Sequence, residues 1–557
     1  MGPMQRQIII LMVMVHSIAF LFSHVSAASI LGDDWAGFFK EKVTISGFVE
    51  NTSGIATGHG DSNFNTSNRF IMNRFTLQPE ININFAEQLK FFISWRFVGE
   101  PRYSSETKSR RATVQPAGSG QPLPVDFYSE YKGIPWEAVA DISPTDRLQI
   151  RLGRQFISWG ETDGLRILDL IDPQDNTIFT PAAPNLFSLE ETRIPQWGIR
   201  MLYTVRPVSN TILEFFANPG WEEKKKRVDD VSPGNDISDG HADGDLRFGR
   251  WSVHPETRIA SGRLFANPLG TLPVVVPVAR REYPDAGDSW KVGARITHNF
   301  GELNAGVGYI WGYNPQGLDM VFKRESTPFL LGPPSPGTPT GIRLKLVNDR
   351  TNIFAAHLNY PVGEPLGIPI KSALRGELAF YPDKPYNISE FPGRNCVTGA
   401  PTGLIAGPSC KHPSNIVEKH TLRYSIGLDR STFIPFLQDD PWRPFRMSLQ
   451  LFQSVIFDHE DGIRNFFNAG KIKRYQSAIT FRVGTGYFGD TILPDFFMLY
   501  EPLGNWVFNP AITYAPSWNE NIRISLIGAI YDGNKFTGIT GFFTRKDSVF
   551  LQMRYQF

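Results

Sequence analysis

The sequence predicts an all-β fold, a transmembrane antiparallel β-barrel of about 18 strands, with 16 as the alternative, preceded by a cleaved signal peptide. Three observations support this prediction. Segments with apolar residues at every second position recur along the chain, the connections between them alternate between short and long, and the last segment ends on an aromatic residue. A period of two indicates strands with one apolar and one polar face, and an even series with loops sorted by length is typical of barrels that cross a membrane.

Residues 1–27 have the layout of a secretory signal peptide. Arg6 gives a short positive start, residues 8–22 are almost entirely apolar, and Val25-Ser26-Ala27 offers small residues for cleavage. This pattern is typical of an exported protein. The alternative, a helix that anchors the chain, is disfavoured because the apolar run is shorter than the roughly 20 residues that a spanning helix needs. We expect residues 28–557 to form one domain, the barrel.

The composition limits the classes of function. Beyond residue 27 no apolar stretch is long enough for a spanning helix, and the mean hydropathy is −0.22, which excludes a helical membrane protein. A barrel fits, because its inward polar residues cancel its outward apolar ones in any hydropathy window. Aromatic residues make up 13% of the chain, beside 50 glycines and 42 prolines, which favours strands and turns over helices. A net charge of +1 argues against a nucleic-acid binder, which would need a strongly basic domain.

The strand pattern is clearest near the start of the mature chain. In residues 75–85, and again in residues 89–98 after a short turn, apolar residues alternate with polar ones, which indicates a hairpin. Pro79 lies in the first of these strands, where we expect a weakened ladder because proline has no N–H to donate. The same pattern predicts strands at 43–55, 69–85, 89–98, 125–140, 147–159, 193–204, 211–218, 290–299, 303–313, 344–360, 370–381, 416–428, 445–457, 474–487, 491–500, 506–514, 521–531 and 549–557.

The connections between these strands sort by length. Those after even-numbered strands are mostly short, at 86–88, 141–146, 206–210, 301–302 and 515–518. Those after odd-numbered strands are mostly long, at 101–124, 160–192, 219–289, 314–343, 383–415 and 458–473. Short periplasmic turns and long outer loops alternate in this way in a membrane barrel, whereas a soluble sandwich has no reason to sort its loops. The exceptions, a longer connection at 431–443 and a tight link near Leu503, leave 16 strands as the alternative.

The largest connection, 219–289, has roughly seventy residues and combines the basic run 224–227 with six aspartates between 229 and 245. A loop of this length folds over a mouth, into a lumen or against a partner. Carboxylates suit Ca²⁺, but their spacing is not that of an EF-hand, so we predict no metal site and no cofactor.

The two cysteines, Cys396 and Cys410, lie in a segment rich in Pro, Gly and Ser. In an exported protein we expect them to form a loop disulfide, with two free thiols as the alternative.

The alternation also predicts which side chains face the lumen. Arginines recur in the polar register, while acids in that register are fewer, chiefly Glu80, Glu377 and Asp429. One interpretation is a structural ladder that pairs with loop acids; the other is a positive lumen that prefers anionic or amphipathic solutes. The predicted pore-lining residues are Arg96, Arg151, Arg200, Arg295, Arg375, Arg423, Arg446 and Arg523.

One stretch carries a family resemblance. Its motifs are Gly153-Arg154-Gln155, Ser158-Trp159-Gly160-Glu161 with Asp163-Gly164, Ile171-Asp172-Pro173-Gln174-Asp175 and Ile194-Pro195-Gln196-Trp197-Gly198. This stretch resembles the outer-membrane family catalogued as domain of unknown function 1302, which is related to the alginate-export type of barrel. The resemblance implies an outer-membrane channel, in a family often encoded beside transport systems for envelope lipids or hydrophobic compounds. It supplies no substrate.

The same stretch holds the predicted constriction loop. A strand ends at Trp159 in an irregular segment near 160–191 whose acids need water or cations, namely Glu161, Asp163, Asp169 and Asp172. We expect this loop to fold inward and narrow the pore. The alternative is an outer loop whose carboxylates are satisfied structurally.

The last strand, 549–557, places apolar residues at every second position and ends on Phe557. It is similar to the C-terminal signal strand of outer-membrane barrels, in which Tyr555 and Phe557 would be read by the assembly machinery. We expect it to close the barrel against the strand at 43–55.

The sequence therefore predicts a channel in the outer membrane of a Gram-negative bacterium that passes a small anionic or hydrophobic solute. The alternatives are a surface adhesin or receptor, or an enzyme, on the same scaffold; no Gly-x-Ser-x-Gly or His-Glu-x-x-His motif supports an enzyme. Expected partners are outer-membrane lipid, lipopolysaccharide and the barrel assembly machinery. A periplasmic or inner-membrane transport partner is compatible with this prediction, and no nucleic-acid partner is expected.

Overall fold

The computed structural model describes residues 41–57, 70–99, 135–172, 193, 195–219, 277–281, 290–313, 321–324, 329–330, 340–346, 350–363, 372–388, 412, 416–438, 440, 442–464, 471–534, 537–538, 540–544 and 547–557 of the chain. These residues form a closed antiparallel barrel. Each wall strand pairs with the next along the chain, and the last strand pairs with the first.

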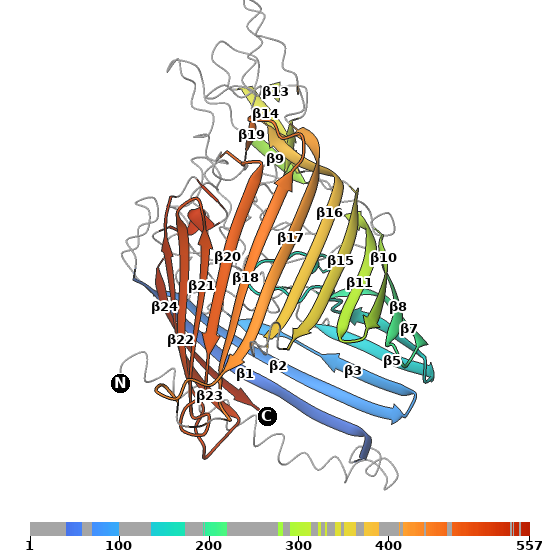
Figure 1. Ribbon diagram of the computed structural model, residues 1–557, viewed down its shortest axis with the longest axis vertical. Coiled ribbons are helices and arrows are strands. Elements are labelled where there is room, and N and C mark those ends of the chain that lie inside the picture. The colour runs from blue at the N-terminus through green and yellow to red at the C-terminus, as the bar shows by residue number, and fades with distance from the viewer. Residues whose placement is uncertain are drawn as a thin grey trace, which may run out of the picture.

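The wall has 18 strands when β3 and β4 are taken as one broken strand, which confirms the prediction of 18 and removes the alternative of 16. The strands are β1 (Val43–Ala56), β2 (Phe70–Ala86), β3 (Leu89–Ser94) with β4 (Phe97–Gly99), β5 (Glu137–Thr145), β6 (Leu148–Gln155), β7 (Gln196–Arg206), β8 (Thr211–Asn218), β10 (Lys291–Phe300), β11 (Leu303–Tyr313), β15 (Arg350–Val362), β16 (Ser372–Ile388), β17 (Ile416–Thr432), β18 (Phe445–Ile456), β20 (Tyr475–Gly484), β21 (Ile492–Glu501), β22 (Asn505–Tyr514), β23 (Ile522–Asp532) and β24 (Ser548–Gln556). In Figure 1 the yellow and orange strands β15 to β18 and β20 run steeply, while the blue strands β1 to β3 run obliquely.

The period of two in the sequence becomes two chemically different faces. In β8, Leu213 and Phe215 are 44% and 42% exposed on the outside, whereas Glu214 and Phe216 are buried on the inside. The same holds for Ile426 and Leu428 on β17 and for their neighbours around the wall. An apolar outer face and a polar lumen, enclosed by a continuous ring of hydrogen-bonded strands, form a barrel of the Gram-negative outer membrane.

The seam between β1 and β24 confirms the predicted closing pair. Glu50 lies opposite Arg554 and Val49 opposite Tyr555. Beyond the last paired residue, the backbones of Phe557 and Gly47 exchange two hydrogen bonds of 2.9 and 3.0 Å. Gly47 has a φ of +153°, and a Cβ there would lie 2.3 Å from the carbonyl oxygen of Gln78 and 2.9 Å from the Phe557 ring. The terminal ring therefore sits where only glycine leaves room for it.

Most of the short connections gather at the lower end of the barrel, and the extra strands β9 (Pro277–Arg281), β13 (Phe329–Leu330), β14 (Thr340–Leu346) and β19 (Ile463–Arg464) lie at the upper end (Figure 1). β9 pairs with β14, and β12 (Phe322–Arg324) and β13 also pair with β14 in a small separate sheet. The longer connection 433–444 nonetheless belongs to the short-turn end. Its buried Gln438 donates to the carbonyl of Gly486 at 2.6 Å and the hydroxyl of Thr485 at 3.3 Å in the neighbouring turn.

Some predicted boundaries are wrong. Asp141, expected in a turn, lies inside β5, and the turn follows Thr145 instead. The strand expected to reach Trp159 ends at Gln155, and the single strand expected at 344–360 is two strands, β14 and β15, in different sheets. The weakened ladder at Pro79 is confirmed on one side of β2. Leu77 pairs with β4 and Glu80 pairs with β3, and the interruption between them lies opposite the break between β3 and β4.

In the described part of the chain no helix is both long enough and apolar enough to cross a membrane. The signal peptide at 1–27, both cysteines, Cys396 and Cys410, and nearly all of the connection 219–289 lie outside the described residues.

Candidate functional site

After β6 the chain leaves the wall and lies against its inner face. We call residues 156–172 the inward segment. Along it, Trp159 contacts Phe216 of β8, Glu161 and Leu168 bond to Glu377 of β16, and other residues reach β10, β18 and β21. All of these partners belong to the inward-facing register of strands that curve round one side of the barrel. A single coil can reach them together only from the concave side, so the segment lies in the lumen.

The first set of contacts between the inward segment and the wall is apolar. Ile157, Trp159, Ile167, Leu168 and Ile171 are buried, and they pack on a patch of inner-wall side chains. That patch consists of Phe216, Ile310, Ile353, Ala355, Ala379, Tyr381, Phe452 and Ala478. Apolar residues on the inner face of a wall are unusual in a polar lumen and would be costly if left in water. Burial of both apolar surfaces is therefore the force that folds the segment inward.

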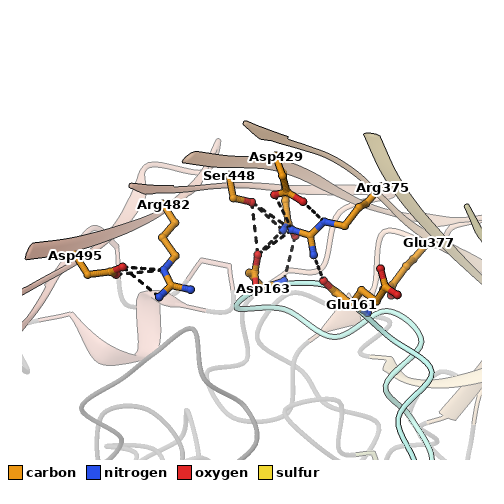
Figure 2. A network of polar contacts seen from close by, with 9 residues as sticks. Glu161, Asp163, Arg375, Glu377, Asp429, Ser448, Arg482 and Asp495 are labelled. Atoms are coloured by element: carbon orange, nitrogen blue, oxygen red, sulfur yellow. Dashed lines mark hydrogen bonds and ion pairs between the residues drawn. The ribbon is translucent and has the colours of Figure 1, made fainter. Parts of the chain in front are cut away.

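The second set of contacts is made by the Glu377 carboxylate of β16. It accepts the backbone N–H of Leu168 at 3.1 Å and makes a second, close contact with the N–H of Glu161. Because Glu377 is only 6% exposed, these two donors supply the partners that its charge loses to burial. Figure 2 shows Glu377 beside Glu161 at the edge of the same polar network.

The third set of contacts is made by Arg375, which lies two residues before Glu377 on the same inner face. Its guanidinium bridges the inward segment and β17. Nη2 donates to Oδ2 of Asp163 at 3.1 Å and to Oδ1 of Asp429 at 2.8 Å. It also donates to the backbone carbonyl of Glu161. Gln450 of β18 makes two hydrogen bonds to Asp163. Its side-chain amide donates to the Asp163 carboxylate at 2.7 Å, and its side-chain oxygen accepts the backbone N–H of Asp163 at 3.2 Å. Figure 2 shows Arg375 and Ser448 converging on Asp163, with Asp429 also in contact with the guanidinium.

The far end of the segment is tied as well. Lys291 of β10, itself 6% exposed, donates to the carbonyl of Ile171 at 2.7 Å. Asp169 pairs with Arg193 at 3.0 Å and with Arg166 at 3.4 Å. The carboxylate of Asp172 accepts the backbone N–H of Ile157 at 2.8 Å, which joins the two ends of the segment.

Asp172 is fully buried, and burial raises its pKa to about 7 despite the hydrogen bond from Ile157. A carboxyl taken out of water loses the hydration of its charged form, so the neutral form is favoured. The second oxygen, Oδ1, has no hydrogen-bond partner among the described residues. The segment is therefore closed by a group that changes charge near neutral pH.

All five residues predicted for the constriction loop lie in the inward segment, but their roles differ from those expected. Trp159 packs on Phe216, and Asp163, Asp169 and Asp172 bind protein groups rather than the expected water or cations. The Glu161 carboxylate makes no ion pair or side-chain hydrogen bond within the described part of the chain. Lys291, Gln450 and the apolar inner patch were missed. The signal for the patch was present, as apolar residues in the otherwise polar register of β11, β15 and β18.

The predicted arginines lie on the inner face and fall into two groups. Six are engaged: Arg375 as above, Arg151 with Asp141 at 2.7 Å, Arg200 and Arg295 both with Glu214 at 2.6 Å, Arg96 with Gln78 at 2.8 Å, and Arg423 over the ring of Tyr381 at 5.8 Å. An analogous pair that the sequence analysis did not single out joins Arg482 to Asp495 at 3.1 Å (Figure 2).

The other two, Arg446 and Arg523, have no ion pair or hydrogen bond from their guanidinium groups within the part of the chain that the structure describes. Each is the second residue of its strand, β18 and β23, at the short-turn end, and each is exposed. We call these two the mouth arginines, and Arg200, Arg295 and Arg375 the central arginines.

Among solved structures, the chain is similar to OccAB1 of Acinetobacter baumannii, with 9% identity and a TM-score of 0.43 over 92% of this chain and 96% of that one. It is similar to Salmonella typhi OmpF in its complex with daunomycin, with 10% identity and a TM-score of 0.37 over 92% and 97%. It is also similar to the outer membrane channel DcaP of Acinetobacter baumannii, with 11% identity and a TM-score of 0.35 over 92% and 97%.

No curated protein matches the sequence. The family described as "Protein of unknown function (DUF1302)" matches residues 9–557. Since this match spans nearly the whole sequence, including the signal-like start, the inward segment and the closing strand, the chain belongs to the DUF1302 family.

Proposed function

We propose that the protein is an outer-membrane channel whose lumen is narrowed by the inward segment and which favours small anionic solutes. The observation that carries this proposal is the attachment of one coil, residues 156–172, to inner-face side chains from β8 round to β21. A coil fixed at so many points on one side of the lumen takes up cross-section that an open barrel would give to water. Solutes then pass on the side that the segment leaves free.

The solute preference follows from the charges that remain after pairing. Arg151, Arg375 and Arg482 are each paired with Asp, so they add little net positive field. The mouth arginines, Arg446 and Arg523, are exposed and carry no such partner among the described residues. Two uncompensated charges inside a water-filled mouth attract anions and repel cations there.

The test is single-channel recording of the refolded protein in planar bilayers. Replacing residues 158–171 by a short Gly-Ser linker should raise the conductance several-fold, because the lumen gains the cross-section that the segment occupied. A full-length channel and a linker variant with equal conductance would contradict the proposal. Heat-modifiable migration on gels and the circular dichroism of both proteins should establish that the barrel is folded.

A further inference from the structure

A cavity of about 270 Å³ lies beside the inward segment and is lined by residues of β7, β8, β10, β11, β15 and β16. Trp159 and Glu161 of the segment form part of its lining, and Asn304, the second residue after the 301–302 turn, is also part of it. The cavity therefore runs from the inward segment toward the short-turn end. A solute crossing the channel on this side would pass through it.

The charged wall of the cavity has an unusual arrangement. The two oxygens of Glu214, a buried carboxylate, each accept one Nε–H, from Arg200 on one side and from Arg295 on the other, both at 2.6 Å. One negative charge thus serves two positive ones. The terminal Nη groups of both arginines have no hydrogen bond to any described residue. The pair is consequently a fixed fork of spare donors with a surplus of one positive charge.

The other lining residues include polar and apolar groups. His357, Arg375 and Glu377 line the cavity on the side of β15 and β16, where Arg375 and Glu377 are engaged by the inward segment. Leu202 and Ile212, inward-facing residues of β7 and β8, offer apolar surface beside the arginine fork. Trp159, with its ring 5.1 Å from the Arg295 guanidinium, offers more at the roof. On the segment side, the Glu161 carboxylate lines the cavity with no partner in the described structure and would repel a second negative charge.

We propose that this cavity is a binding site for a small monocarboxylate with an apolar body, its carboxylate on the Arg200–Arg295 fork and its body on Leu202, Ile212 and Trp159. The inference rests on the proposed function, because it names the class of solute that pauses beneath the inward segment. It goes beyond a general anion preference, since the mouth arginines would attract any anion whereas the cavity selects one charge with an apolar tail.

The test uses four probes on the full-length protein, refolded in detergent, with binding measured by calorimetry. Hexanoate carries both features, hexanamide lacks the charge, acetate lacks the tail and adipate has a second charge. We expect saturable binding of hexanoate, about tenfold or more tighter than each of the other three, because charge-assisted hydrogen bonds and a buried tail both contribute. Equal affinity for hexanoate and hexanamide would overturn the inference.

Two variants and a matched control separate the fork from general electrostatics. R295Q/E214Q removes one charge of each sign, so the surplus stays at one, yet hexanoate affinity should fall about tenfold because half of the fork is lost. E214Q alone keeps both arginines and raises the surplus to two, so hexanoate should bind more tightly. R482Q/D495N removes an Arg–Asp pair on β20 and β21, away from the cavity, and should leave the affinity unchanged. Loss of affinity in the control equal to that in R295Q/E214Q would overturn the inference.

The two proposals can fail separately. A channel whose conductance depends on the inward segment, but which binds hexanoate no better than hexanamide, would overturn the binding site and leave the proposed function intact. A conductance that is indifferent to the segment would overturn the proposed function, whatever calorimetry gives.

Discussion

The central and mouth arginines have the same side chain and the same inward register, but they differ in whether an acidic side chain of the described residues lies within ion-pair distance. Arg375 is held by Asp163 and Asp429, and Arg200 and Arg295 share Glu214. Arg446 and Arg523 have no acidic partner in the described part of the chain. A charge already paired with a carboxylate mainly fixes geometry, whereas an unpaired, exposed charge is available to a passing ion. Among the central arginines, Arg375 should therefore control the shape of the lumen, whereas the mouth arginines should set the preference for anions over cations.

Both regions exist only if the barrel closes, so the largest effect is expected at the seam. Deleting Phe557 removes two backbone hydrogen bonds to Gly47, each worth about 1 kcal/mol, and a ring that packs on Gly47. If Tyr555 and Phe557 also form the assembly signal, outer-membrane levels should fall far more than these contacts explain. Quantitative blotting of outer-membrane fractions measures this.

G47A provides the matched comparison for the seam. It keeps Phe557 but places a Cβ 2.3 Å from the Gln78 carbonyl, so it should lower the stability of the closed barrel. Normal outer-membrane levels of the Phe557 deletion would contradict the role of the terminal residue. Loss of levels in G47A alone would place the defect in closure rather than in the signal.

The next effect tests the central arginines. R375Q breaks the link between the inward segment and β17 and leaves Asp163 and Asp429 without their shared cation. Losing hydrogen bonds between charged groups costs about 3 kcal/mol, which raises the fraction of released segment about a hundredfold. We expect frequent openings to a higher conductance in single-channel records. R482Q, which breaks an Arg–Asp pair that does not touch the segment, should show the conductance of the unaltered channel.

A smaller effect tests the mouth arginines. In water at about 8 Å, one guanidinium favours an anion by about 0.5 kcal/mol, a factor of about two. Since the same charge disfavours a cation by the same factor, R446Q/R523Q should lower the ratio of anion to cation permeability about tenfold at low salt, and less at high salt. The control is R151Q/D141N, which removes a compensated pair. An equal fall in that control would erase the distinction between paired and unpaired arginines.

The smallest effect is a dependence on pH. The folded-state pKa of Asp172, about 7, is raised above its ordinary value of 3.8. The stability linked to this group is thus fully present below pH 3.8 and is lost as pH rises through about 7. The closed form of the inward segment should therefore weaken as pH rises from about 4 to about 7, seen as more current noise at pH 8 than at pH 5. D172N cannot ionise and should remove this dependence; an unchanged pH profile in D172N would contradict it.

The sequence was sufficient for the wall because the strand pattern is local. Period-two alternation and the sorting of loops by length placed 18 strands, their faces and the closing pair of β1 and β24. Errors arose where the alternation was weak or continued past the wall. The small residues Ala138 and Ala140 give β5 little contrast, and the apolar residues after Gln155 resemble a strand although they turn into the lumen.

The site could be predicted only in part, because its partners lie far apart in the chain. Arg375 and Asp163 are 212 residues apart, and Gln450 and Asp163 are 287. Register shows that each side chain faces inward, but not which of several inward groups meet. Sequence alone could therefore propose both a structural ladder and a positive lumen, and the structure assigns the ladder to Arg375 and its neighbours while leaving Arg446 and Arg523 outside it.

The central claim is tested most directly by recording single channels of R375Q/D429N and R446Q/R523Q in a tenfold KCl gradient, since one record gives both conductance and reversal potential. R375Q/D429N breaks the link to the inward segment but removes one charge of each sign. We predict that R375Q/D429N changes the conductance and keeps the reversal potential, and that R446Q/R523Q shifts the reversal potential toward cations and keeps the conductance. If both variants alter the same quantity, the division of labour between the central and mouth arginines is contradicted.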